Sequence, residues 1–194
     1  GQASASCRVV CHQLNSLDFF KILLNSRAKR LSLHKQFKVT KFSSMLYPIG
    51  IQSFKEIREG GYAYVDKTDI IYQLTHSGKY FFLSRPRRFG KSLLLSTLEA
   101  YFEGRTELFE GLAIAELEKE WNAYPVMHID LNTGTYDSVE NLKKHLNTQM
   151  SRLESRYGRN ADEELFADRF SGAIMRAVEM TGRKVVVLID EYDK

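Results

Sequence analysis

The central part of the chain places an apolar segment, a loop and a helix directly one after another. Residues 80–83, Tyr-Phe-Phe-Leu, have the aromatic and apolar composition of a buried strand. Residues 91–102 carry apolar side chains at helical spacing, and Gly104 follows as a stop signal. The loop between the two ends in Gly90-Lys91-Ser92. A strand that leads through such a loop into a helix N-terminus predicts a backbone cradle for phosphate oxygens.

The loop follows the phosphate-loop pattern G-x-x-x-x-G-K-[ST] except at its first position. Five residues before Gly90 the chain has Arg85, where the pattern has a glycine that permits a tight turn. We expect Lys91 to reach the terminal phosphates of a nucleotide and the hydroxyl of Ser92 to ligate Mg²⁺. Arg87 and Arg88 either contact phosphates or sense the γ-phosphate, or they pair with acids and fix the shape of the loop. The predicted nucleotide-binding residues are Arg85, Pro86, Arg87, Arg88, Phe89, Gly90, Lys91, Ser92 and Leu93.

A second pattern lies about 100 residues later, where an apolar run is followed by two acids. Residues 184–189 include the longest apolar stretch of the chain and predict a buried strand. Asp190 would hold Mg²⁺, mostly through its water shell, and Glu191 would polarise the attacking water as a general base. Alone, two acids after an apolar strand indicate only a solvated strand end. Together with the loop they predict nucleotide binding.

The remaining segments alternate between strand and helix patterns. The sequence predicts a further strand over 125–131 and helices over 113–121, 138–156 and 161–180. An earlier helix follows the capping residues 66–69 and ends at Gly78. Three core strands that alternate with helices indicate an α/β fold, in which helices cover both faces of a parallel sheet.

Two polar pairs allow both a structural and a functional interpretation. Asp66 and Lys67 could pack near the loop, but as a helix cap and turn they need no function. His128 and Asp130 lie on the strand predicted over 125–131, with Asp130 near the expected edge of the site. For this second pair we favour a polar strand end without a functional role.

The charge of the chain is divided unevenly. Its formal net charge of +4 comes from 28 Lys and Arg and 24 Asp and Glu. Residues 1–44 hold eight bases and one acid, a balance of +7, whereas the other 150 residues hold 20 bases and 23 acids, a balance of −3. General nucleic-acid binding by the second part is therefore not indicated. No apolar run approaches the roughly 18 residues of a membrane span.

The segment 1–44 is rich in Ser, Lys and Arg, and it lacks clear periodicity. We interpret it as a basic leader outside the folded domain. Three origins stay open, namely translated upstream or cloning sequence, a disordered basic arm, or an organelle transit peptide.

Four segments of the chain carry a family resemblance. They are residues 47–54, 64–68, 82–93 and 187–194, which include the loop and the Asp190-Glu191 pair. These segments resemble the predicted AAA-ATPase-like family of bacteria and archaea, whose usual phosphate loop reads Arg-Pro-Arg-Arg-Phe-Gly-Lys-Ser. The resemblance covers about residues 45–194 and implies that Arg85 is typical of the family.

The resemblance implies a P-loop NTPase fold, a three-layer αβα sandwich of which about three core strands are present. It implies that residues 45–194 form the N-terminal part of the ATPase domain. Family members typically add a C-terminal PD-(D/E)XK nuclease-like domain. We therefore expect the chain to be a fragment that stops after the second motif and that hydrolyses ATP poorly by itself.

Three functional hypotheses follow. The leading one is an ATPase switch or motor module of a larger cytoplasmic protein, with ATP and Mg²⁺ as cofactors. The second is a small-molecule kinase, although Asp190 and Glu191 favour activation of water over activation of a hydroxyl. The third is a non-catalytic module through which nucleotide regulates an attached nuclease-like domain. Partners besides ATP would be nucleic acid, reached through that domain, and a second copy of the chain, but not a membrane.

Overall fold

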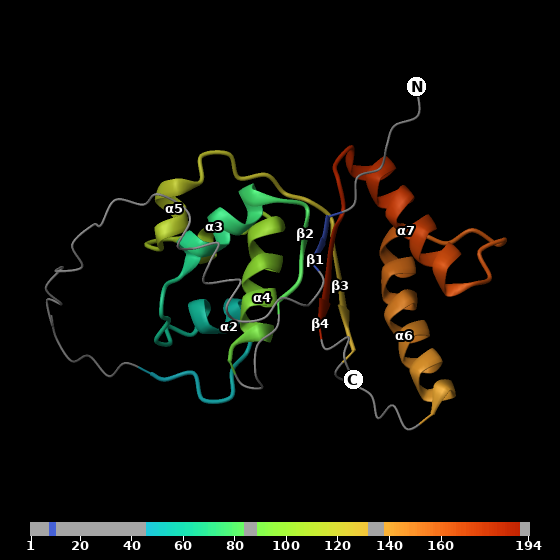
Figure 1. Ribbon diagram of the computed structural model, residues 1–194, viewed down its shortest axis with the longest axis horizontal. Helices are drawn as coiled ribbons and strands as arrows, with labels where there is room; N and C mark the ends of the chain where they lie inside the picture. Colours follow the sequence, from blue (N-terminus) through green and yellow to red (C-terminus); the bar gives the residue numbers. More distant parts are fainter. Residues whose placement is uncertain (1–7, 11–45, 84–88, 132–137, 191–194) are drawn as a thin grey trace, which may run out of the picture.

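The computed structural model describes residues 8–10, 46–83, 89–131 and 138–190. Four parallel strands in the described part form one sheet, in the order β2-β1-β4-β3. The strands are β1 (Arg8–Val10), β2 (Tyr80–Phe81), β3 (Val126–Asp130) and β4 (Val186–Asp190). Helices lie on both faces of this sheet (Figure 1). The predicted α/β fold with a parallel sheet is confirmed.

The helices divide into two layers (Figure 1). One face of the sheet carries α2 (Phe54–Glu59), α3 (Thr68–Ser77), α4 (Lys91–Phe102), the 3₁₀ helix η1 (Thr106–Phe109) and α5 (Ala113–Leu117). The other face carries α6 (Val139–Tyr157) and α7 (Phe166–Thr181). In the described part of the chain, no helix is both long and apolar enough to cross a membrane.

The strand β1 comes from the segment 1–44, for which the sequence predicted no strand. It pairs with both β2 and β4, so that Val10 lies opposite Phe81 and Leu188. Three residues are too few to display a strand period, which is why the pattern did not predict it. Residues 1–7 and 11–45 lie outside the described part, and their interpretation as a leader stays a prediction.

The sheet separates two apolar clusters. Alternate residues of a strand point to opposite faces. Val186 and Leu188 accordingly belong to the cluster around α4, and Val187 belongs to the cluster under α6 and α7. Each of these three side chains is at most 1% exposed. The continuous apolar run therefore reflects a central strand that is covered on both faces.

Asp66 joins two helices of the α4 layer. Its Oδ1 accepts hydrogen bonds from the backbone N–H and the hydroxyl of Thr68, at the start of α3. Its Oδ2 accepts from the backbone N–H of Ala113 at 2.7 Å, at the start of α5. Burial alone would raise the pKa of Asp66, but these hydrogen bonds outweigh it and lower the pKa. Asp66 thus binds the first backbone N–H of α3 from the position before the N-cap residue Lys67, whose own side chain makes no cap hydrogen bond.

The helix α5 is shorter than the predicted range 113–121 because Glu118 turns the chain. The Glu118 side chain accepts a hydrogen bond from the Tyr101 hydroxyl at 2.5 Å and another from the backbone of Glu120 at 3.0 Å. Burial and the hydrogen bond to Glu118 raise the pKa of Tyr101 far above its ordinary value. This tertiary contact, which local pattern does not predict, ends the helix.

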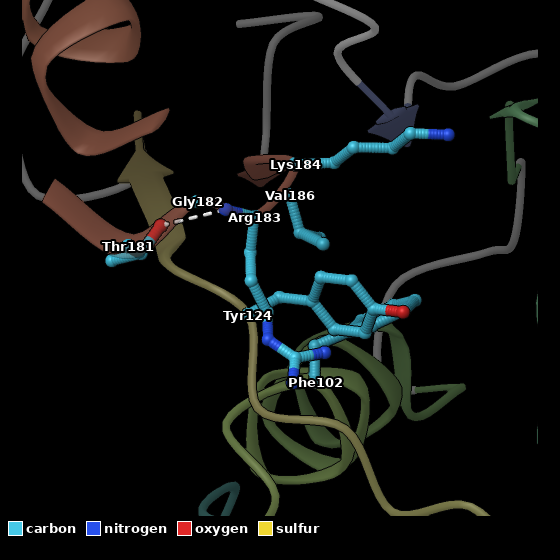
Figure 2. Close-up of a pocket in the computed structure, with 7 residues that line it drawn as sticks. All are labelled: Phe102, Tyr124, Thr181, Gly182, Arg183, Lys184 and Val186. Atoms are coloured by element: carbon cyan, nitrogen blue, oxygen red, sulfur yellow. Dashed lines mark hydrogen bonds between the residues drawn. The ribbon is translucent and has the colours of Figure 1, made fainter. Parts of the chain in front are cut away.

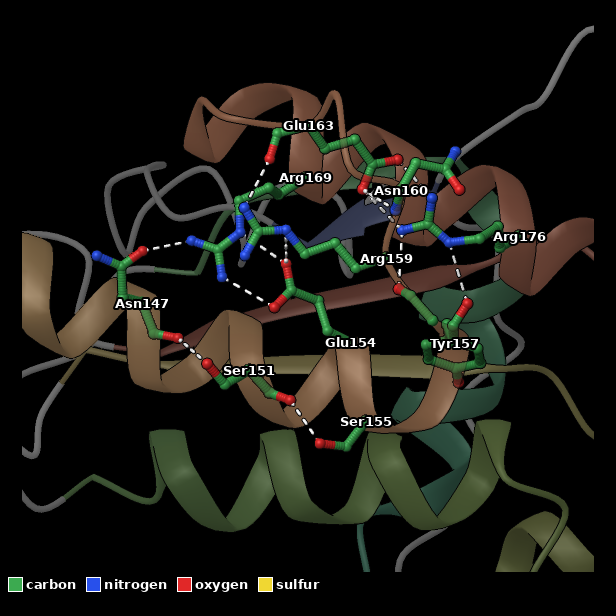
Figure 3. A network of polar contacts seen from close by, with 11 residues as sticks. Asn147, Ser151, Glu154, Ser155, Tyr157, Arg159, Asn160, Glu163, Arg169 and Arg176 are labelled. Atoms are coloured by element: carbon green, nitrogen blue, oxygen red, sulfur yellow. Dashed lines mark hydrogen bonds and ion pairs between the residues drawn. The ribbon is translucent and has the colours of Figure 1, made fainter.

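The helix α7 begins at Phe166, later than the predicted start at residue 161. Before it, the Glu163 carboxylate pairs with Arg176 of α7, and the Glu163 carbonyl accepts a hydrogen bond from Arg159 at 2.9 Å (Figure 3). Gly172 makes room for this contact, since a Cβ there would lie 1.9 Å from Glu163 Oε1. The preceding segment is therefore held against α7 instead of extending it.

Candidate functional site

The strongest candidate site lies where the parallel strands β3 and β4 end and the helix α4 begins. Ser92 in the first turn of α4 donates a hydrogen bond from Oγ to Oδ2 of Asp190, with 2.8 Å between the two oxygens. The two residues are 98 positions apart in the sequence. Asp190 is the last residue of β4 and is only 7% exposed. The fold thus brings together the two residues that the sequence predicted as Mg²⁺ ligands.

Gly90 forms the bend after which α4 begins beside the carboxyl ends of the strands. It precedes the helix with φ 76°, in the left-handed region that favours glycine. Its carbonyl accepts the first helical hydrogen bond, from Leu94 N at 3.0 Å. The backbone N–H groups of the first turn of α4 therefore face outward from the helix end, where they can bind an anion.

Several predicted site residues fall outside the described part of the chain. They are Arg85, Pro86, Arg87, Arg88 and Glu191, and their roles stay predictions. Of the others, Phe89 is exposed, whereas Lys91 is half-buried. Leu93 is half-buried and packs against the apolar cluster around α4. A hydrophobic contact with the protein core is the interaction that the structure assigns to Leu93.

Asp130 lies directly opposite Asp190 in the register of β3 and β4. The backbone continues this pairing, since Leu131 N donates to Asp190 O at 3.1 Å. Two side chains of α6 also hold the end of β3. His145 Nε2 and Gln149 Nε2 both donate to the Asp130 carbonyl, at 2.7 and 3.1 Å. The end of β3 at Asp130, which the sequence indicates as a polar strand end, therefore lies next to the candidate site and is hydrogen-bonded to β4 and α6.

His128 lies one strand period behind Asp130, on the same face of the sheet. Its Nδ1 donates to Oε2 of Glu99, on α4, at 3.2 Å. Its Nε2 is buried and makes no hydrogen bond within the described residues. Burial lowers the pKa of His128, but the Glu99 hydrogen bond and the charges of Glu99, Asp130 and Asp190 raise it more, so the net shift is upward. This contact adds a second attachment of α4 to the strands.

Glu99 was missed by sequence reasoning, although a signal for it existed. Ser92 and Glu99 are seven residues apart in α4, and residues at that spacing lie on the same face of a helix. A polar residue at that spacing on a helix that packs on a sheet indicates a polar partner below it. The identity of that partner, His128, depends on how the helix crosses the strands and is not visible locally.

The chemistry of this site fits Mg²⁺ bound together with a nucleotide. A hydroxyl and a carboxylate are oxygen ligands of the kind that Mg²⁺ prefers. Within the described ranges no group of three or more His, Cys, Asp or Glu side chains is arranged to hold a metal by itself. Mg²⁺ at nucleotide sites typically takes one or two protein ligands, with phosphates and waters completing its shell. Ser92 and Asp190 match that small set.

Comparison with known proteins identifies the family of the chain. The family described as Predicted AAA-ATPase matches residues 48–194. A relative described as "Uncharacterized protein in vnfD 5'region", from Azotobacter chroococcum mcd 1, is 41% identical over 148 residues. That alignment covers 76% of this chain and 29% of the relative, so the chain spans less than a third of the relative's length. No solved structure matches the chain significantly.

Proposed function

Since the chain belongs to the predicted AAA-ATPase family, we propose that it binds Mg-ATP at the carboxyl edge of its sheet. In this proposal residues 45–194, with the short strand β1 between β2 and β4, adopt the three-layer αβα sandwich of P-loop NTPases. The chain then forms the nucleotide-binding ATPase module, a switch or motor, of a larger protein.

The observation that carries the proposal is the hydrogen bond between Ser92 and Asp190. It joins the first turn of α4 to the last residue of β4. Two oxygen ligands 2.8 Å apart can bind one cation, and the adjacent helix N-terminus can bind a phosphate group at the same time. A hydroxyl–carboxylate hydrogen bond of this kind also keeps both side chains in place before a ligand arrives.

Each residue of the proposed site has a separate task. The backbone of the loop 85–90 and the N-terminus of α4 bind phosphate oxygens, and Lys91 contributes a positive charge. Ser92 and Asp190 would hold Mg²⁺, which neutralises charge on the phosphate oxygens when bound. Glu191 follows Asp190 in the chain and accepts a proton from the attacking water as general base.

Two variants test these assignments. We expect Lys91→Ala to lose ATP affinity, because the lysine charge on the phosphates is removed. We expect Glu191→Gln to bind ATP but not to hydrolyse it, since the amide cannot accept the proton. Equilibrium binding with a fluorescent ATP analogue and release of inorganic phosphate measure the two properties. Normal turnover by Glu191→Gln would remove Glu191 from its proposed role.

The same measurements separate the alternatives. ATP binding by the unaltered full-length protein without phosphate release would favour a nucleotide-regulated, non-catalytic module. Turnover that requires an added acceptor alcohol would favour a small-molecule kinase. Retention of full ATP affinity in Lys91→Ala would contradict the proposed site itself.

A further inference from the structure

A hollow at the amino end of the sheet lies far from the proposed nucleotide site. It is lined by Phe102, the last residue of α4, and by Val186, the first residue of β4 (Figure 2). Ser92 and Asp190 lie at the other ends of the same two elements. The hollow has a volume of about 430 Å³. Small-molecule sites span roughly 300–1,000 Å³, so it is large enough for one compact ligand.

The base of the hollow is apolar and aromatic. Phe102 and Val186 are both buried in the cluster around α4. Tyr124 forms a wall, and its ring meets that of Phe102 edge to face, with 6.0 Å between the centroids. Flat apolar groups pack well against such rings, and burying them there removes apolar surface from water.

The charges that line the hollow are all positive. Arg183 and Lys184 occupy adjacent positions in the turn between α7 and β4, and their side chains diverge (Figure 2). No acidic residue is among the described lining residues. Arg183 is held in place, because its guanidinium lies 5.8 Å from the Tyr124 ring centroid and donates to Asn122 Oδ1 at 2.7 Å. These contacts orient the exposed guanidinium, whose remaining N–H groups can donate to an anion.

We propose that this hollow is a second ligand site, which binds a small anion that carries an aromatic ring. The ring would pack against Tyr124 and the exposed edge of Phe102, and a phosphate or carboxylate group would face Arg183, with the diverging Lys184 adding a second positive charge on another side of the hollow. This site goes beyond the proposed ATPase function, because it uses none of the residues of the phosphate loop or of the Asp190 edge. Aryl phosphates and aryl carboxylates share the required chemistry.

Ligand-observed NMR titration of the full chain tests the proposal with simple probes. Phenyl phosphate and benzoate carry both a ring and an anionic group, whereas phenol lacks the charge and inorganic phosphate lacks the ring. We expect the first two to bind more tightly than the last two. We expect Arg183→Ala and Lys184→Ala each to weaken binding roughly three- to tenfold, the range of an exposed charge-assisted contact.

Two controls locate the signal. Lys143 is exposed on α6. Lys143→Ala therefore removes the same charge elsewhere and should leave the affinity unchanged. Binding of phenyl phosphate that persists in Lys91→Ala would support the second site and is independent of whether ATP binds. Binding that is lost in Lys91→Ala and retained in both Arg183→Ala and Lys184→Ala would overturn the proposal, as would equal affinities for phenyl phosphate and phenol.

Discussion

Two side-chain contacts attach α4 to the strands beneath it. Ser92 donates to Asp190 at the edge of the sheet, and His128 donates to Glu99 deeper along the helix. The first contact belongs to the proposed Mg-ATP site. The second involves a titratable pair, which makes its state dependent on pH.

Glu99 should control the pKa of His128. Burial lowers that pKa, but the hydrogen bond and charge of Glu99 raise it more, so it lies above the ordinary value of 6.5. A raised folded pKa contributes stability that is complete below the unfolded value and is lost as pH rises through the folded value. We expect Glu99→Gln to lower the pKa of His128 in an NMR titration. As the pH rises above 6.5, the unfolding free energy of the variant should also fall less than that of the unaltered protein.

The matched control for this prediction is Glu116→Gln. Glu116 is exposed on α5, so its substitution removes the same charge away from the pair. The pKa of His128 should not change in that variant. If Glu99→Gln also left it unchanged, the charge of Glu99 would not determine the protonation of His128.

At the scale of the element, Gly172 allows the segment before α7 to dock. A Cβ at this position would lie 1.9 Å from Glu163 Oε1 and 2.8 Å from Arg176 Nη1. Alanine would gain about 1 kcal/mol of helix propensity but would displace the ion pair. The atoms that alanine would meet are the ends of two long side chains, which can move aside, so we expect Gly172→Ala to lower the unfolding free energy by no more than about 1 kcal/mol. Urea unfolding followed by circular dichroism measures the change.

A second substitution isolates the cause. In a Glu163→Ala background the main obstacle is absent, so Gly172→Ala should cost less there than in the unaltered protein. Ser171→Ala, at an exposed position of the same helix, should change stability by no more than about 0.5 kcal/mol. An equal cost of Gly172→Ala in both backgrounds would contradict the packing explanation.

Elements with complete local signals were predicted closely from the sequence. The helix over 91–102 was found at the predicted bounds, because apolar spacing, Gly90 and Gly104 all specify it locally. The helix α2 was not predicted, although Ser53 and Glu56 form a capping signal. Ser53 Oγ accepts a hydrogen bond from Glu56 N at 3.3 Å, so the signal operates in the structure.

Other features depend on contacts between distant segments. The late start of α7 results from the docking of Glu163 on Arg176, and the early end of α5 results from Glu118 binding Tyr101. No local pattern encodes such pairs. The Ser92–Asp190 contact also spans distant segments. It could be predicted only because two separate motifs, the phosphate loop and the acidic strand end, together indicate one nucleotide site.

At the scale of the molecule, four carboxylates stabilise different regions as anions. They are Asp66, Glu118, Glu154 and Glu163, and the pKa of each is lowered. Burial opposes the shift in every case. Hydrogen bonds outweigh it for Asp66 and Glu118, whereas for Glu154 and Glu163 the hydrogen bond from an arginine is the largest cause.

These shifts predict a loss of stability in acid. A lowered folded pKa contributes stability that is complete above the unfolded value and is lost as pH falls through the folded value. The ordinary values are 3.8 for Asp and 4.5 for Glu. We therefore expect the urea midpoint to fall steadily as the pH decreases below about 4.5. A midpoint that stayed constant from pH 5 to pH 3 would show that these contacts do not stabilise the fold.

The most direct test of the central claim is the effect of Mg²⁺ on ATP affinity in Asp190→Asn. This substitution keeps the shape of the side chain and removes the charge that would hold the cation. Calorimetric titration of ATP with and without Mg²⁺ should show tighter binding with Mg²⁺ in the unaltered protein and no such gain in the variant. Asp168→Asn, at an exposed position of α7, should behave like the unaltered protein. An undiminished gain from Mg²⁺ in Asp190→Asn would contradict the account.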